Sequence, residues 1–145
     1  MDPADRLALL VLGMHRSGTS ALTRILNLLG AEIGDDLLPA HPDNPAGFWE
    51  SRDIVLLHDE ILATLGSSWD DPRPIPDTAF ERDGIRPHRE RLRELLERDF
   101  GRSRCFVVKD PRLCRLLPLW LPLLEEMGVR AGCVLAGRHP DEAQA

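Results

Sequence analysis

LALLVLGMHRSGTSALTRIL, residues Leu7 to Leu26, joins an apolar run to a loop between two glycines and then to a helical pattern. The near-continuous apolar run over residues 6–13 is typical of a buried strand in a parallel sheet. Apolar residues then recur at helical spacing from Leu22 to Leu29, and Gly30 provides a stop signal. A strand, a glycine loop and a helix in this order predict the opening of a doubly wound α/β domain.

The remainder of the chain alternates between helical patterns and apolar runs. Two more strands are expected, at 105–108 and 129–137, and two more helices, at 54–65 and 87–100. The second of these helices is charged, and we expect it to lie on the sheet with a solvated outer face. A further leucine-rich helix, ending at Gly128, is expected to be interrupted by Pro118 and Pro122.

Proline-rich segments separate these elements. Residues 35–48 and 67–77 carry closely spaced prolines with Asp, Asn and Ser, and they predict surface loops. The whole chain, residues 1–145, is therefore expected to form one three-layer α/β/α domain around a parallel sheet.

Composition limits the class of protein. The 18 basic and 24 acidic residues give a net charge of −6, which argues against a general nucleic-acid binder. No apolar stretch approaches membrane-spanning length, and the acidic start, Met1 to Asp5, does not fit a signal peptide. The three cysteines lack the spacing of a metal site and indicate reduced thiols. A cytoplasmic protein without membrane insertion is predicted.

The loop between Gly13 and Gly18 has the spacing of a phosphate-binding turn. Its backbone N–H groups and the following helix N-terminus favour phosphate or sulfate. Thr19 stands where a nucleotide triphosphatase carries lysine, and a cation appears earlier, at Arg16. We expect such a loop to hold one 5′-phosphate and its attached group rather than a triphosphate. The candidate anion-binding residues are Gly13, His15, Arg16, Ser17, Gly18, Thr19 and Ser20.

Two further cations follow predicted strands. Lys109, the only lysine of the chain, ends the second strand, and Arg138 follows the third. Ligands of open parallel sheets gather beyond the carboxyl ends of the strands. Lys109, Arg138 and the Gly13 loop are therefore expected to share a ligand.

Three motifs together resemble the sulfotransferase family that uses 3′-phosphoadenosine-5′-phosphosulfate (PAPS) as donor. GMHRSGTS, from Gly13, resembles its 5′-phosphosulfate loop, and FVVKDPR, from Phe106, resembles the strand end that follows in bacterial and Golgi-type members. VLAGRHP, from Val134, resembles the start of the family's 3′-phosphate-binding segment. GFWE, from Gly47, also looks like the bacterial branch. The resemblance implies a fold like that of P-loop nucleotide triphosphate hydrolases. It also implies transfer of a sulfuryl group from PAPS to a hydroxyl or amine acceptor without metal.

The resemblance implies catalytic roles for Arg16 and Lys109, Arg16 at the 5′-phosphate and Lys109 at the sulfuryl group, and it places Arg138 at the 3′-phosphate. The catalytic histidine of the family's cytosolic members is missing after Lys109. Glu50, between the long loop and the second helix, is the expected general base, with helix capping as its alternative role and His15 and His58 as the other candidates. His15 is expected to contact the anion or orient the backbone rather than act as base. The chain ends at Ala145, before the serine and the basic segment that complete the family's 3′-phosphate site, so we expect an incomplete domain.

Several other residues have structural interpretations. His58 is expected to be a partly buried structural histidine, and Asp110 a strand-end cap or a partner of Arg112. Phe48 and Trp49 are expected to pack in the core rather than to line an acceptor pocket.

Two other functions fit the sequence. One is a P-loop kinase that uses ATP and Mg²⁺, since an apolar run before Asp110 mimics a magnesium-binding strand; Thr19 in place of lysine argues against it. The other is an inactive nucleotide-binding fragment. The acceptor could be a small molecule, a glycan or a lipid, and the sequence does not indicate an oligomeric state.

Overall fold

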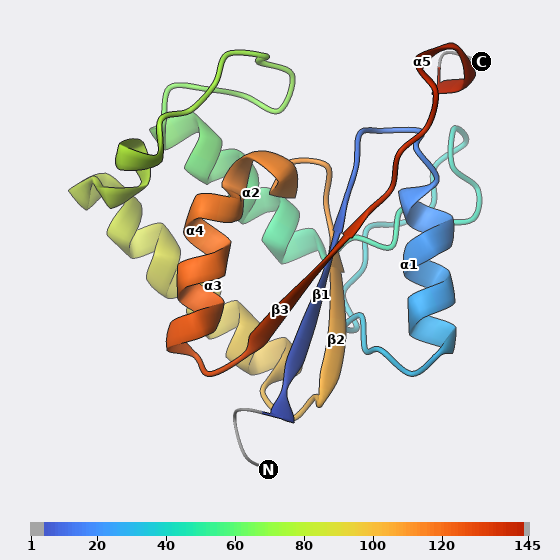
Figure 1. The fold of residues 1–145 in the computed structure, drawn as a ribbon, viewed down its shortest axis with the longest axis horizontal. Helices are drawn as coiled ribbons and strands as arrows, with labels where there is room; N and C mark the ends of the chain where they lie inside the picture. Colours follow the sequence, from blue (N-terminus) through green and yellow to red (C-terminus); the bar gives the residue numbers. More distant parts are fainter. Residues whose placement is uncertain (1–4, 144–145) are drawn as a thin grey trace.

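A three-stranded parallel sheet forms the centre of the structure, a computed structural model that describes residues 5–143 (Figure 1). The strands are β1 (Leu7–Leu12), β2 (Cys105–Lys109) and β3 (Arg130–Leu135), and β1 lies between the other two. Leu7 pairs with Cys105 on one side and with Arg130 on the other, so all three strands run in register. The predicted strands and their parallel order are confirmed. Met1 to Ala4, part of the acidic start, lie outside the described residues.

Helices cover both faces of this sheet, as a three-layer α/β/α arrangement requires (Figure 1). Helix α1 (Thr19–Leu28) lies alone on one face, over a small apolar cluster that includes Val11 and Val107. On the other face, α2 (Arg52–Thr64) and α4 (Leu113–Glu126) share the main core with Leu10 and Phe106. The α/β class expected from the sequence is therefore observed.

Helix α3 (Arg86–Phe100) differs from its expected position. It packs mainly on α2 and α4, and its C-terminal end reaches the sheet. Its buried residues are Leu92, Leu96 and Phe100, and the Phe100 ring stacks on Phe106 of β2 with centroids 4.4 Å apart. The narrow apolar stripe suits this position because the other faces of α3 remain solvated.

The two prolines of α4 do not interrupt it, contrary to the sequence-based expectation. The helix is continuous from Leu113 to Glu126 although Pro118 and Pro122 provide no N–H for the carbonyls four residues earlier. An internal proline costs about 3 kcal/mol in an isolated helix. Here the cost is offset by burial of one apolar face, made of Leu113, Leu116, Leu119, Trp120, Leu123 and Leu124.

The segments between these elements largely follow the predicted loops. Positive backbone angles at Gly30 (φ 107°) and Gly66 (φ 72°) allow α1 and α2 to end where the sequence indicates. Two short 3₁₀ helices were not expected, η2 (Asp77–Glu81) and η3 (Asp83–Ile85). A final short helix, α5 (Pro140–Ala143), follows β3. Within residues 5–143, every helix is too short or too polar to span a membrane.

Candidate functional site

The turn at the end of β1 depends on a glycine. A Cβ atom at Gly13 would lie 2.8 Å from Thr19 Cγ2 and 2.9 Å from the Ala136 carbonyl oxygen. The same region is fixed by the Ala136 N–H, which donates to the Leu12 carbonyl at 2.8 Å. Gly13 therefore allows the end of β1, the start of α1 and the exit of β3 to meet.

Replacing Gly13 with alanine is expected to lower the free energy of unfolding by about 1 to 3 kcal/mol, because the backbone around Ala136 must shift to accept the methyl group. Gly137→Ala is a matched control on the same segment, since a Cβ there meets nothing within 4 Å. The control is expected to change stability by less than about 0.5 kcal/mol. Urea unfolding of both variants measures the difference; equal stabilities would contradict the close contact at Gly13.

The turn itself presents an open helix N-terminus. Arg16 (φ 64°) and Gly18 (φ 83°) adopt left-handed backbone conformations, and Gly18 occupies the N-cap position of α1 without a capping side chain. The first N–H groups of a helix have no partner within the helix. Because the first turn of α1 contains no acidic residue, its positive end is not neutralised locally. This terminus can bind an anion.

A pocket of about 790 Å³ lies in front of this helix end and is called the anion pocket below. Its lining residues are His15, Arg16, Gly18, Thr19, Ser20, Asp43, Asn44, Phe48, Lys109, Arg138 and Glu142. Seven of the predicted site residues are in this set, while Gly13, Ser17 and Glu50 do not line the pocket. The structure thus brings together the loop, Lys109 and Arg138 at the carboxyl ends of the three strands.

Arg138 connects the end of β3 to the loop. Its Nη1 lies 3.5 Å from the Arg16 carbonyl oxygen, at the limit of a hydrogen bond, and its Nε lies 3.6 Å from the Glu142 carboxylate. Both contacts are exposed and contribute little to stability. The guanidinium is therefore held at the mouth of the anion pocket by weak interactions that a phosphate can replace.

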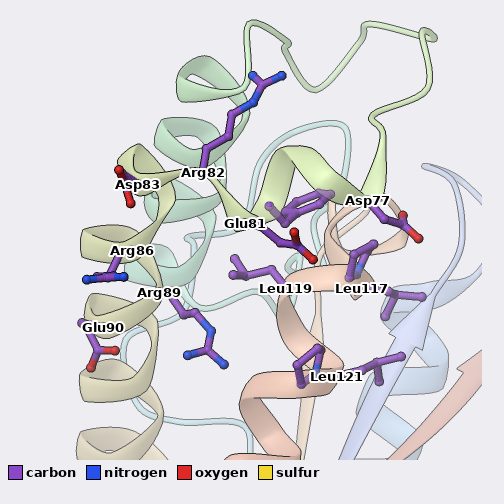
Figure 2. Close-up of a pocket in the computed structure, with 13 residues that line it drawn as sticks. Asp77, Glu81, Arg82, Asp83, Arg86, Arg89, Glu90, Leu117, Leu119 and Leu121 are labelled. Atoms are coloured by element: carbon purple, nitrogen blue, oxygen red, sulfur yellow. The ribbon is translucent and has the colours of Figure 1, made fainter.

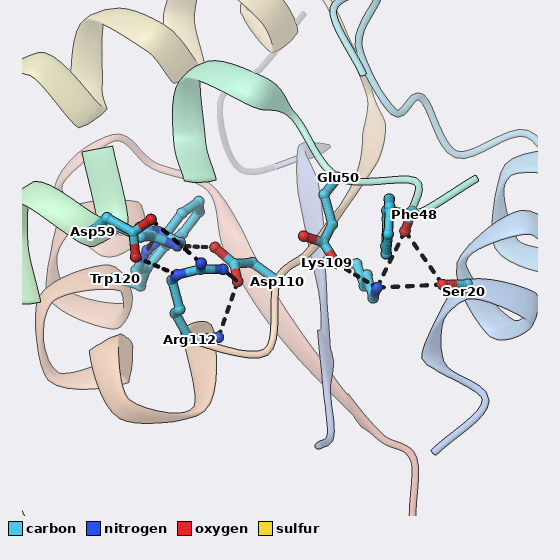
Figure 3. Close-up of polar contacts among 9 residues, drawn as sticks. Ser20, Phe48, Glu50, Asp59, Lys109, Asp110, Arg112 and Trp120 are labelled. Carbon is cyan, nitrogen blue, oxygen red and sulfur yellow. Dashed lines mark hydrogen bonds and ion pairs between the residues drawn. The ribbon is translucent and has the colours of Figure 1, made fainter. Parts of the chain in front are cut away.

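Lys109 lines the anion pocket and is buried, and Figure 3 shows its polar contacts. Its Nζ donates to Glu50 Oε1 at 2.5 Å, to the Phe48 carbonyl at 3.2 Å and to Ser20 Oγ at 3.3 Å. The side chains of Lys109 and Glu50 are only 5% and 6% exposed. Three acceptors thus hold the ammonium group, which suits its three N–H donors.

The segment Gly47 to Glu50 supplies two of these acceptors because its backbone turns sharply. Gly47 (φ 93°) and Trp49 (φ 59°) are both left-handed, and the Trp49 ring lies under the Arg24 guanidinium of α1 at 4.9 Å. Phe48 lines the anion pocket and Trp49 is half-buried, so the predicted core packing of both residues is wrong. The residue sequence before α2 gave no local signal for these contacts.

Glu50 is not a helix cap. Helix α2 begins at Arg52 after Ser51, and the Glu50 side chain bonds Lys109 instead. Burial raises the pKa of Glu50, and the neighbouring Lys109 charge opposes this rise. A general base must reach the proton that it removes, and Glu50 reaches the anion pocket only through Lys109.

The residue after Lys109 belongs to a buried network (Figure 3). Asp110 accepts hydrogen bonds from His58 Nδ1 at 2.7 Å and from the backbone N–H and Nη1 of Arg112, both at 3.0 Å. Trp120 Nε1 donates to His58 Nε2 at 2.9 Å. Because an indole nitrogen can only donate, His58 carries its proton on Nδ1 and is neutral. His58 is fully buried, and the predicted partnership of Asp110 with Arg112 is confirmed.

Opposing effects act on the Asp110 carboxylate. Burial disfavours its charge, but the hydrogen bond from His58 and the charge of Arg112 outweigh burial and lower the pKa of Asp110 below its ordinary value of 3.8. Arg112 is held in turn by Asp59, whose Oδ1 accepts from Nε at 2.6 Å. The network fixes the chain that leaves β2 and so fixes Lys109.

A second pocket, of about 680 Å³, adjoins the loop on its other side and is called the Trp69 pocket below. It lies between the loop after α2 and the start of α4, and Met14, Trp69, Ile75 and Cys114 are among its lining residues. His15 also lines it and meets Trp69 edge to face, with ring centroids 5.5 Å apart. Sequence patterns gave no reason to connect Trp69 with the loop, because the two are far apart in the chain.

A third pocket, of about 650 Å³, opens between α4 and the segment from η2 to α3 (Figure 2). Leucines of α4, including Leu119 and Leu121, line one side of the pocket. The charged side chains of Arg82, Arg86 and Arg89 line the opposite side. None of the predicted site residues lines this pocket. It is therefore separate from the anion pocket.

Comparisons of the chain with models of protein families, with curated proteins and with solved structures found no match.

Proposed function

We propose that the protein transfers a sulfuryl group from PAPS to a hydroxyl or amine acceptor, on a fold of the P-loop type. One observation carries this proposal: the open N-terminus of α1, the loop cation Arg16, Lys109 and Arg138 line a single pocket at the carboxyl ends of the strands. A fixed arrangement of backbone N–H groups and cations stabilises oxygens that gain negative charge in a transfer reaction. The moving sulfuryl group is supplied by the bound donor.

Different residues of the anion pocket would bind different parts of the donor. Arg16 and the N–H groups at the start of α1 would bind the 5′-phosphate, and Arg138 would bind the 3′-phosphate. Lys109 would meet the sulfuryl oxygens by exchanging one of its longer bonds, to Ser20 or Phe48, while Glu50 keeps it in place. Asp43 and Glu142 also line the pocket, and Arg138 would exchange its 3.6 Å contact with Glu142 for the 3′-phosphate.

Two features argue against a kinase that uses ATP and Mg²⁺. Asp110, at the position of a magnesium-binding strand end, is 1% exposed and is already bonded to His58 and Arg112. A carboxylate engaged in this way cannot bind a metal ion without breaking the network. Thr19 also takes the place of the lysine that would bind the terminal phosphates.

Replacing Arg16 with alanine is expected to weaken binding of adenosine 3′,5′-bisphosphate by about 1.5 to 3 kcal/mol, the range for a hydrogen bond to a charged group. Calorimetric titration of wild type and variant measures this loss. Arg24→Ala serves as a matched control, because Arg24 lies on α1 over Trp49 and does not line the anion pocket.

The same titration separates the candidate functions. Wild type should bind the bisphosphate in preference to ATP with Mg²⁺, and the reverse preference would support a kinase. Binding without any transfer from PAPS would support an inactive nucleotide-binding protein. An affinity that Arg16→Ala leaves unchanged would remove Arg16 from the site.

A further inference from the structure

Among the described residues 5–143, His15 alone lines both the anion pocket and the Trp69 pocket. The two pockets therefore meet at one imidazole ring, on the loop that faces the proposed donor. A group-transfer reaction needs a second substrate whose reacting atom approaches the donor from outside. The Trp69 pocket provides such a place next to the loop.

Most of the charged residues around the Trp69 pocket are hydrogen-bonded to other protein groups. Arg73 donates to both carboxylate oxygens of Asp71, with Nη2 at 2.8 Å from Oδ2. Arg115 donates to the carbonyl oxygens of Ser68 at 2.7 Å and of Arg73 at 2.9 Å. A charged ligand would have to break these pairs, so the pocket favours an uncharged one.

The remaining lining is apolar and accessible. Trp69 is 56% exposed and Met14 is 71% exposed, and Ile75 lies with them in the lining. Four prolines complete it, Pro72, Pro74, Pro111 and Pro118. A volume of about 680 Å³ lies within the range of pockets that hold small ligands. The exposed Trp69 ring can stack on a flat aromatic or fused-ring molecule.

We propose that the Trp69 pocket is the acceptor site, that it takes an uncharged aromatic or fused-ring alcohol, and that His15 removes the proton of the acceptor hydroxyl. This inference rests on the proposed function. As the acceptor oxygen forms its bond to the donor's sulfur, its proton moves to the His15 imidazole. The bond from sulfur to the 5′-phosphate oxygen breaks, and its electron pair leaves on the adenosine bisphosphate. His15 then returns the proton to solvent.

The position of His15 distinguishes it from Glu50 as the base. Glu50 lines neither pocket and is bonded to Lys109, whereas His15 lines both. Partial burial lowers the pKa of His15, and the charges of Lys109 and Arg112 lower it further, against a smaller opposite effect of Asp110. The ring is therefore neutral near pH 7 and able to accept a proton.

The test uses 2-naphthol as the probe. Its binding to the full chain is titrated with and without saturating adenosine 3′,5′-bisphosphate, and its sulfation by PAPS is followed in single turnovers. Trp69→Ala is expected to weaken 2-naphthol binding by at least about tenfold and to leave bisphosphate binding unchanged. Leu121→Ala, in the third pocket, is the matched control and should change neither.

His15→Gln tests the proton transfer. It is expected to keep 2-naphthol binding within about threefold and to slow sulfation by at least about a hundredfold. Wild-type sulfation rates in His15→Gln would overturn the role of His15 as the base. Equal binding of 2-naphthol by wild type and Trp69→Ala, or no binding at all, would overturn the acceptor site. Tighter binding of 4-hydroxybenzoate or N-acetylglucosamine would overturn the ligand class. Failure of wild type to bind the bisphosphate would instead refute the proposed function, and the role of His15 with it.

Discussion

Asp110→Asn is expected to lower the free energy of unfolding by about 3 kcal/mol, although it changes one atom of a residue that no proposed substrate touches. The reason lies in the donors around it. His58 Nδ1 and two N–H groups of Arg112 all donate to the Asp110 carboxylate, which is 1% exposed. A carboxylate accepts at both oxygens, whereas an amide accepts at only one.

No orientation of the asparagine amide satisfies these donors. With its NH₂ toward His58, two donors face each other unless the imidazole moves its proton to Nε2, and there it would meet the indole N–H of Trp120. With its NH₂ toward Arg112, the amide faces a cation. A buried donor is left without a partner in each arrangement, at a cost of about 1 to 3 kcal/mol, and the Arg112 charge loses compensation.

Asp59→Asn is the matched control for this prediction. Asp59 binds the same Arg112 guanidinium, but its side chain is 46% exposed, so its loss is expected to cost less than about 1 kcal/mol. Urea unfolding at neutral pH measures both variants. A variant at Asp110 that is as stable as the variant at Asp59 would show that the buried network does not act as described.

The same network predicts a dependence on pH. Because the pKa of Asp110 is lowered below 3.8 in the folded protein, its carboxylate contributes stability above that value. This contribution is lost as the pH falls from 3.8 through the lower pKa of the folded state. The difference in stability between wild type and Asp110→Asn should therefore narrow below pH 3.8 and remain constant above it.

The fold could be predicted from local signals. The apolar run of β1, the glycines of the loop and the helical period of α1 each lie within one short segment, where residue spacing determines structure. The meeting of the loop, Lys109 and Arg138 followed from topology, because parallel strands bring their carboxyl ends to one edge of the sheet. No contact between particular side chains was needed for either prediction.

The partners within the site could not be predicted in this way. Lys109 and Glu50 are 59 residues apart, and His58 and Asp110 are 52 residues apart. Such pairs depend on how α2 packs against the sheet, which residue spacing does not encode. The continuity of α4 through Pro118 and Pro122 could not be predicted for the same reason. Burial of its leucines, which depends on tertiary packing, outweighs the local cost of the two prolines.

Lys109→Met is expected to produce the other large effect, on both stability and transfer. It leaves the Glu50 carboxylate buried without its cation, and removal of one partner from a buried ion pair costs about 3 to 5 kcal/mol. It also removes the one ammonium group proposed to meet the sulfuryl oxygens, so transfer from PAPS should fall by about a hundredfold or more. Urea unfolding and single-turnover assays measure the two effects separately.

The double variant Lys109→Met with Glu50→Gln separates folding from catalysis. A neutral amide no longer needs a buried cation, so the double variant should regain about 2 kcal/mol of the lost stability, since replacing both members of a buried pair is far less costly than replacing one. Transfer should not return, because the ammonium group is still missing. Ser20→Ala is the control for the stability effect, since it removes the 3.3 Å bond to Lys109 and the 3.4 Å bond to the Phe48 carbonyl but keeps the ion pair. A double variant that recovers transfer together with stability would show that Lys109 acts only by holding Glu50 in the fold.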